Sequence, residues 1–250
     1  MDSTNKLTKK QKRVLRNQDP NKMAVIDKLN FKLKYIEPLT ENQKLVFTNY
    51  SQGKHLLLHG LAGTGKSFLS IYLSLKEIIN NPNNAYKKLY IIRSAVSTRD
   101  IGFMPGKAKD KAGVYEAPYY YICNKLFERQ DAYDYLKQKS IVEFMTTSFI
   151  RGITLDNCII IVDEMANLNL HELDSVITRV GDNCKIIFCG DFSQTDFTKE
   201  SEKRGLPDFM KIIDNMKSFG RIEFDKEEDI VRSGLAREYL IQKKRLGIVT

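Results

Sequence analysis

The stretch from residue 60 to residue 67 constrains the fold of this chain more than any other. Its sequence is Gly-Leu-Ala-Gly-Thr-Gly-Lys-Ser, which fills the pattern G-x-x-x-x-G-K-[ST] at every fixed position. An apolar run of strand type, 55–59, precedes it, and an apolar pattern with helical spacing follows. A glycine-rich turn between a strand and a helix is typical of a phosphate-binding loop. The sequence therefore predicts an α/β fold with an anion site at the end of a strand.

The pattern also predicts which residues would hold a nucleotide. Glycines let the backbone curl so that its N–H groups face a polyphosphate, and a helix starting near Gly65 would direct its positive end at the same place. Lys66 would reach the β- and γ-phosphates, and the Ser67 hydroxyl would hold Mg²⁺. The expected nucleotide-binding residues in this stretch are Gly60, Leu61, Ala62, Gly63, Thr64, Gly65, Lys66, Ser67 and Phe68.

Strand-like and helical patterns alternate along the rest of the chain. The strand-like runs are 55–59, 89–93, 141–145, 158–163, 185–189 and 221–224; the helical patterns lie near 66–80, 116–129, 131–139, 170–180, 206–217 and 229–243. Several strand-like runs are continuously apolar, which is typical of a parallel sheet covered on both faces. We therefore expect a doubly wound, mainly parallel sheet with helices on both faces. Residues 99–118, which contain glycines, prolines and lysines, are expected to form a long surface loop.

Two adjacent acids end one of the apolar runs. Asp163 and Glu164 follow the run Ile-Ile-Ile-Val, at the sheet edge where ligands of such folds bind. Asp163 is a candidate Mg²⁺ ligand, directly or through water, and Glu164 can polarise a water molecule for attack on a γ-phosphate. Gln194 follows the run 185–189, so its amide is a candidate sensor of the γ-phosphate.

Two more polar residues are candidates on weaker local signals. Gln43 lies in a predicted helix with Thr40 as N-cap, and its amide could pair with both the donor and the acceptor edge of adenine. Arg232 could stabilise charge on a transferring phosphoryl group. Each also has a plainer interpretation, since Gln43 suits an ordinary helix start and Arg232 an exposed helix.

Charge is unevenly distributed over the chain. The formal net charge is +9, yet residues 1–34 hold ten Lys or Arg and three Asp, which leaves +2 for all the rest. A basic N-terminal arm, 1–38, on a nearly neutral domain, 39–250, suggests a polyanionic partner such as nucleic acid, or a solvated tail.

The four cysteines lack metal-site spacing and are expected to be reduced, buried small hydrophobes. Without an apolar run long enough to span a bilayer, or a signal peptide, we expect a cytoplasmic protein with no membrane partner.

Taken together, these segments resemble the PhoH-like ATPases, a family related to the ATPase core of superfamily 1 helicases. The resemblance runs from about Leu39 to Leu240, and its motifs come in the family's order: 39–43, 60–67, 91–96, 102–106, 150–154, 162–164, 190–194 and 229–235. The most specific are Gly-Phe-Met-Pro-Gly at 102–106 and the Arg-Gly pair at 151–152. The chain departs from the family at Ser94, where proline is usual, and at Met104, where leucine is usual. Within these 250 residues we expect no nuclease domain of the kind fused to some relatives. The compact form is similar to versions from bacteriophages, which would place it in the host cytoplasm.

The resemblance implies a P-loop NTPase of RecA-like type that binds ATP and Mg²⁺, hydrolyses ATP slowly, and couples to single-stranded RNA or DNA. Lys66, Glu164, Gln194 and Arg232 are then the expected catalytic residues. One domain of this type leaves Arg232 either to fold back in cis or to enter a neighbour's site, and the second arrangement predicts a homo-oligomer such as a hexameric ring. The candidate nucleic-acid contacts are Lys107, Lys109, Lys111, Tyr115, Tyr119, Tyr120 and Tyr121.

Three other functions compete with this one. A small-molecule kinase is disfavoured because Asp163 and Glu164 suit attack by water. A nuclease is disfavoured because no further carboxylate cluster stands apart from the expected ATP site. An ATP-switched module that binds a protein, without nucleic-acid activity, stays open as the alternative.

Overall fold

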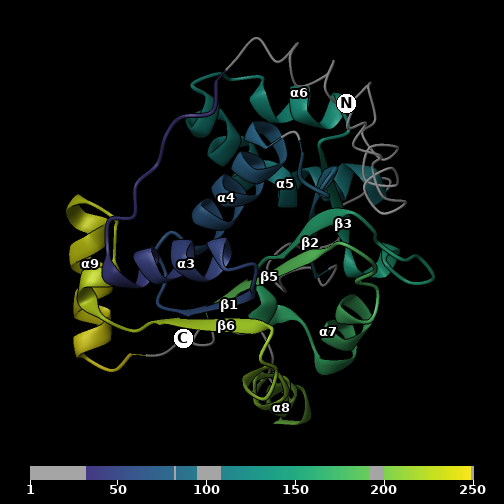
Figure 1. The fold of residues 1–250 in the computed structure, drawn as a ribbon. Helices are drawn as coiled ribbons and strands as arrows, with labels where there is room; N and C mark the ends of the chain where they lie inside the picture. The colour runs from purple at the N-terminus through teal and green to yellow at the C-terminus, as the bar shows by residue number, and fades with distance from the viewer. Residues whose placement is uncertain (1–31, 82, 95–107, 192–199, 249–250) are drawn as a thin grey trace, which may run out of the picture.

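The computed structural model of the chain describes residues 32–81, 83–94, 108–191 and 200–248. In this part, six parallel strands form one sheet in the order β3-β2-β4-β5-β1-β6 (Figure 1). The strands are β1 (His55–Gly60), β2 (Lys88–Arg93), β3 (Val142–Thr146), β4 (Cys158–Val162), β5 (Lys185–Gly190) and β6 (Phe219–Phe224). All six strands expected from the sequence are thus present, within two residues at each end.

Helices cover both faces of the sheet (Figure 1). One face carries α3 (Glu41–Ser51), α4 (Lys66–Asn80), α5 (Ala108–Phe127) and α6 (Ala132–Gln138); the other carries α7 (Leu170–Ile177) and α8 (Glu200–Asp214). The last helix, α9 (Gly234–Arg245), lies past the end of β6. This arrangement confirms the doubly wound α/β fold of a P-loop NTPase of RecA-like type.

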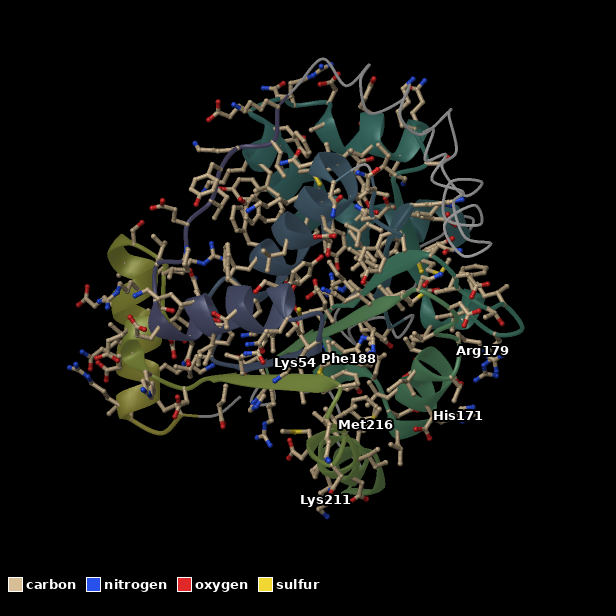
Figure 2. All side chains as sticks on the ribbon, in the orientation of Figure 1. Lys54, His171, Arg179, Phe188, Lys211 and Met216 are labelled. Atoms are coloured by element: carbon tan, nitrogen blue, oxygen red, sulfur yellow. The ribbon has the colours of Figure 1, made fainter. Side chains whose placement is uncertain are left out.

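The core consists of two apolar layers, one on each side of the sheet. Along β1, Leu56 and Leu58 face the layer under α3–α6, whereas Leu57 faces the layer over α7 and α8. Phe188 of β5 is fully buried in the second layer, and Figure 2 shows Lys211 of α8 at the outer surface beyond it. Because central strands are buried on both faces, their sequences are continuously apolar rather than alternating.

The prediction of a surface loop over 99–118 is wrong from residue 108 onward. Residues 108–127 form α5, and Pro118 lies inside it. Tyr119, Cys123 and Leu126 recur at helical spacing and are fully buried in the core, so the apolar stripe outweighs the proline. Residues 95–107 lie outside the described residues.

The end of the expected basic arm contacts the domain. Leu33 is buried in the core, and the N–H of Lys34 donates to the carbonyl of Leu126 at 2.8 Å. Residues 1–31 lie outside the described part of the chain. Among the helices that the structure does describe, none is long and apolar enough to cross a bilayer.

Candidate active site

The loop between β1 and α4 depends on glycine where β6 approaches it. The N–H of Leu61 donates to the carbonyl of Phe224 at 2.8 Å. Gly60 has φ +114°, and a Cβ at this position would lie 2.3 Å from that carbonyl oxygen. Any side chain at residue 60 would therefore collide with the backbone of β6, so steric exclusion explains the first glycine of the motif.

Lys66 is folded over the loop that it follows. Its ammonium donates to the carbonyls of Gly60 at 2.8 Å and Leu61 at 2.7 Å, and to the Thr64 hydroxyl at 3.3 Å. Burial lowers the pKa of Lys66, and the nearby carboxylate of Asp191 opposes that shift. The ammonium is thus held at the mouth of the loop, where the phosphates of a nucleotide are expected.

Asp163 receives a hydrogen bond on each of its two oxygens. The Ser67 hydroxyl donates to Oδ1 at 2.6 Å, and the Tyr119 hydroxyl donates to Oδ2 at 2.8 Å. The Asp163 side chain is buried, and its own N–H donates to the carbonyl of Ile92 at 2.9 Å. Burial and the Asp163 charge hold the pKa of Tyr119 well above its usual range, so this hydroxyl stays a donor. The two oxygens expected to hold Mg²⁺, from Ser67 and Asp163, are therefore adjacent, and hard oxygen ligands fit that ion.

Glu164 stands next to this pair in a strained conformation. Its φ of +53° lies in the left-handed region, which non-glycine residues seldom adopt. The side chain is half-buried, and burial together with the Asp163 charge raises the pKa of its carboxyl group, while Arg93 opposes the shift. Such a carboxyl group is better suited to accept a proton near neutral pH than an exposed one.

Both halves of the Gln43 amide are hydrogen-bonded, and one of them holds the loop. Its Nε2 donates to the carbonyl of Thr64 at 3.0 Å, and its Oε1 accepts from the N–H of Leu39 at 2.8 Å. Thr40 caps α3 as expected, by accepting from the N–H of Gln43 at 3.2 Å. An adenine contact through the Gln43 amide, which stays a prediction, would have to replace these two bonds.

Arg232 lies against the loop of its own chain. A Cβ on Gly63 would lie 2.8 Å from Arg232 Cγ, and the N–H of Val231 donates to the carbonyl of Gly63 at 3.0 Å. The side chain of Asn42 ties the same segment to α3, because its Nδ2 donates to Asp229 Oδ2 at 2.8 Å. Within one chain, Arg232 is thus beside the nucleotide-binding loop.

Other expected residues lie outside the described part or occupy different places. Gln194 and Lys107 lie outside the described residues, as do the side chains of Lys109 and Lys111. Tyr119 is fully buried and cannot stack on a base, because its ring packs in the core. The Tyr120 hydroxyl donates to Asp134 at 2.7 Å. Tyr121, by contrast, is 65% exposed.

Sequence reasoning missed two residues of the site. Tyr119 was considered as a nucleic-acid contact or as a residue that packs its helix, whereas its hydroxyl donates to Asp163. Arg93 ends β2 at the same sheet edge, and its guanidinium lies 5.8 Å from the centre of the Tyr115 ring. A charged residue directly after an apolar strand was the available signal for Arg93, and nothing in the sequence pointed to Tyr119.

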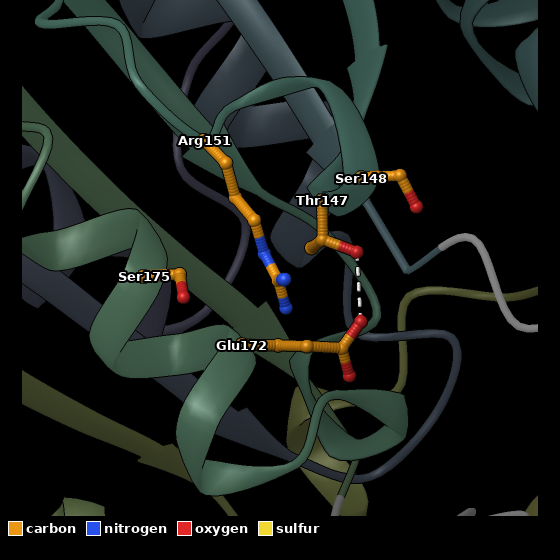
Figure 3. Close-up of a pocket in the computed structure, with 5 residues that line it drawn as sticks. All are labelled: Thr147, Ser148, Arg151, Glu172 and Ser175. Atoms are coloured by element: carbon orange, nitrogen blue, oxygen red, sulfur yellow. Dashed lines mark hydrogen bonds between the residues drawn. The ribbon is translucent and has the colours of Figure 1, made fainter.

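A separate polar cavity of about 230 Å³ opens beyond the end of β3. Figure 3 shows its lining residues, with the Arg151 side chain extending toward Glu172; the lining consists of Thr147, Ser148, Arg151, Glu172 and Ser175. Glu172 accepts from the Thr147 hydroxyl at 2.7 Å and from the N–H of Asn169 at 3.1 Å, which completes the capping box of α7. Arg151, from the Arg-Gly pair of the sequence, is exposed here.

Comparison with known families matches residues 35–242 to the family described as PhoH-like protein. This chain belongs to that family. The PhoH-like protein of Bacillus subtilis is 31% identical over 182 residues, which are 72% of this chain and 55% of the relative. Protein PhoH of Escherichia coli is 27% identical over 210 residues, 83% of this chain and 55% of the relative. The chain thus spans about half the length of these PhoH-like relatives.

Solved structures that match this chain include a phage terminase and a helicase. The large terminase of a thermophilic bacteriophage, in complex with ADP, is 13% identical, with a TM-score of 0.47 over 82% of this chain and 50% of that one. Pif1 helicase from Candida albicans is 15% identical, with a TM-score of 0.37 over 77% of this chain and 41% of that one. Because both TM-scores are below 0.5, membership of the PhoH-like family rests on the sequence comparison.

Proposed function

We propose that this chain binds ATP with Mg²⁺ at residues 60–67 and hydrolyses it. The observation that carries the proposal is the 2.6 Å contact between Ser67 and Asp163, which are 96 residues apart in the sequence. A loop serine and an acid that follows another strand of the same sheet are the residues that usually hold Mg²⁺ on a bound nucleotide. Membership of the PhoH-like family supports the same activity.

Each residue then has a defined part in the reaction. Lys66 would turn from the carbonyls of Gly60 and Leu61 to the β- and γ-phosphate oxygens. Mg²⁺, when bound by Ser67 and Asp163, would neutralise charge on those oxygens. Glu164 would accept a proton from water as the water oxygen bonds to the γ-phosphorus and the bond to the bridging oxygen breaks, releasing ADP.

The remaining predicted residues complete the proposal. Arg232 would balance charge on the γ-phosphate in cis, which its contact with Gly63 of the same chain supports. Gln194 is assigned to sensing the γ-phosphate and Gln43 to the adenine side of the site, and both assignments stay predictions. The expected homo-oligomer, such as a hexameric ring, also stays a prediction, and light scattering over a range of protein concentrations tests it.

Phosphate release tests the ATPase proposal. Lys66→Ala removes the cation that the loop holds, and Lys87→Ala removes an exposed cation far from it along the chain. We expect Mg²⁺-dependent hydrolysis by the wild-type protein and by Lys87→Ala, and a loss of about 100-fold or more in Lys66→Ala. Equal rates in all three proteins would contradict the proposed site.

We further propose that hydrolysis is coupled to single-stranded nucleic acid, either RNA or DNA. The net charge of +9, the exposed Arg151 beside a polar cavity and the exposed Tyr121 support this coupling. Arginine binds backbone phosphates and exposed aromatic rings stack on bases. Stimulation by single-stranded RNA or DNA that weakens as salt rises, and that falls in Arg151→Ala but not in Arg129→Ala, is the expected result.

One observation favours the alternative of an ATP-switched protein-binding module. Leu235 and Tyr239 lie one helical turn apart on α9 and are 81% and 64% exposed. An exposed apolar pair of this kind suits a protein partner. Two results would favour this function over the first: a hydrolysis rate that no single-stranded nucleic acid changes, and binding of nucleic acid that does not depend on salt.

A further inference from the structure

Tyr119 reaches the candidate metal site from a different element than the residues predicted to hold the ion. It lies on α5, whereas Ser67 is in the first turn of α4 and Asp163 follows β4. The Tyr119 side chain has no exposed surface, and its ring packs 5.9 Å from the ring of Phe144. Its position is therefore fixed by the core rather than by the site that it touches.

The Tyr119 hydroxyl completes the hydrogen bonding of a buried carboxylate. Asp163 Oδ2 accepts from Tyr119 at 2.8 Å, and Oδ1 accepts from Ser67 at 2.6 Å. If Ser67 and Asp163 held an ion through the Ser67 oxygen and Asp163 Oδ1, the hydrogen bond between them would be given up, whereas the Tyr119 bond to Oδ2 could remain. A donor that holds one carboxylate oxygen fixes the rotation of the group and so the direction in which the other oxygen points.

The face of α5 that carries Tyr119 also approaches the second acid. Tyr115 lies one turn earlier, and the Arg93 guanidinium stands 5.8 Å from its ring centre. Arg93 in turn favours the charged form of Glu164. One helix face thus contacts Asp163 through Tyr119, and through Tyr115 it lies beside the arginine whose charge acts on Glu164.

We propose that Tyr119 is a positioning residue for the metal site. Its hydroxyl would hold Asp163 Oδ2 so that Oδ1 and the Ser67 hydroxyl can face the ion. This proposal rests on the proposed binding of Mg²⁺ and ATP. It assigns α5 a role in setting metal affinity. It also gives a reason why a tyrosine, and not a phenylalanine, fills a fully buried position.

Tyr119→Phe tests the proposal because it removes one oxygen and keeps the ring. The matched control is Tyr120→Phe on the same helix, which also removes a bond from a tyrosine to an aspartate, the one to Asp134. Binding of fluorescently labelled ADP is measured during a Mg²⁺ titration and, separately, in EDTA. Thermal unfolding of each protein without nucleotide shows whether the fold is retained.

We expect Tyr119→Phe to need about 10-fold more Mg²⁺ for half-maximal effect, with binding in EDTA unchanged and Tyr120→Phe like the wild type. In an Asp163→Asn background, Tyr119→Phe should have no further effect on the Mg²⁺ dependence. The proposal is overturned if Tyr119→Phe and the wild type share one Mg²⁺ dependence, or if binding in EDTA weakens by the same factor. Wild-type binding that ignores Mg²⁺ would instead refute the proposed function itself.

Discussion

The Ser67 hydroxyl and Asp163 Oδ1 lie 2.6 Å apart at the edge where α4 begins and β4 ends. Ser67 comes from the phosphate-binding loop and Asp163 from a strand two positions away in the sheet, with β5 between. Parallel strands bring their carboxyl ends to one edge, so the fold itself creates this contact. The chemistry proposed for the chain depends on it.

The bond between Ser67 and Asp163 should stabilise the protein without any ligand. Ser67→Ala leaves a buried carboxylate oxygen without its donor, so we expect the free energy of unfolding to fall by about 1.5–3 kcal/mol. Ser51→Ala, which removes an exposed serine, should change it by less than about 0.5 kcal/mol. Urea unfolding measures both, and equal losses would show that the Ser67 bond contributes nothing specific.

A methyl group at Gly63 should act through Arg232 as well as through the backbone. Gly63→Ala would place Cβ 2.8 Å from Arg232 Cγ and 3.0 Å from Leu240 Cδ1. Gly53→Ala is the control, since its φ of +80° is similar to the +74° of Gly63 but nothing lies within 4 Å. We expect Gly53→Ala to cost about 1 kcal/mol of stability and Gly63→Ala to cost more.

The Arg232 contact can be separated from the backbone strain. In Arg232→Ala, the Cγ that meets the new methyl group is absent, so the extra cost of Gly63→Ala should shrink. A double-mutant cycle followed by thermal unfolding gives this coupling. An unchanged cost of Gly63→Ala in both backgrounds would mean that Arg232 does not rest on the loop.

His59 should make the protein less stable in mild acid. It is buried in β1 and accepts a hydrogen bond from Arg221 Nε at 2.8 Å, and burial lowers its pKa from 6.5 to about 4. Below pH 6.5 the His59 imidazole is protonated in the unfolded chain, whereas in the folded chain it stays neutral down to about pH 4. The free energy of unfolding therefore falls as pH drops through this window, by up to about 3 kcal/mol.

His59→Gln isolates this contribution. The amide oxygen of glutamine can still accept from Arg221 but does not titrate in this range. Unfolding of both proteins in urea from pH 7 to pH 4 should show a smaller loss in the variant. Parallel pH curves for the two proteins would assign the acid sensitivity to other groups.

Cys158 and Cys184 should form a disulfide under oxidising conditions. Their Sγ atoms lie 3.4 Å apart on neighbouring strand ends, Cys184 is half-buried, and the bond from Cys158 lowers the pKa of Cys184. With oxidised glutathione as the oxidant, the two thiols should give one disulfide and two reduced glutathione molecules. Mass spectrometry should find the cross-link in Cys123→Ser and not in Cys184→Ser. Cys158 and Cys184 still unlinked in Cys123→Ser would contradict this prediction.

The strands and the phosphate-binding loop could be predicted from the sequence because their signals are local. Doubly buried strands such as β4 are continuously apolar, and the glycines of the loop are required by nearby backbone, as at Gly60. The strand order was not predicted, because it depends on how distant segments pair. The proximity of Cys158 and Cys184 follows from that pairing and was missed with it.

The predicted site was incomplete where it depends on packing between helices. Asp163 and Glu164 were recognised from their position after an apolar strand, but Tyr119 was not, because its place in the helix expected near 116–129 does not show which strand end its hydroxyl contacts. The contact of Arg232 with its own loop depends on the path from β6 to α9, which no local pattern encodes. Local chemistry was thus predictable, whereas contacts between distant elements were not.

The most direct test of the central claim separates ATP binding from ATP hydrolysis in Glu164→Gln. The change removes the proposed proton acceptor and keeps the size and the left-handed position of the residue. The account predicts Mg²⁺-dependent ATP binding within about 3-fold of the wild type and a loss of phosphate release of about 100-fold or more, with Glu238→Gln unaffected. Glu164→Gln that hydrolyses ATP at the wild-type rate would contradict it.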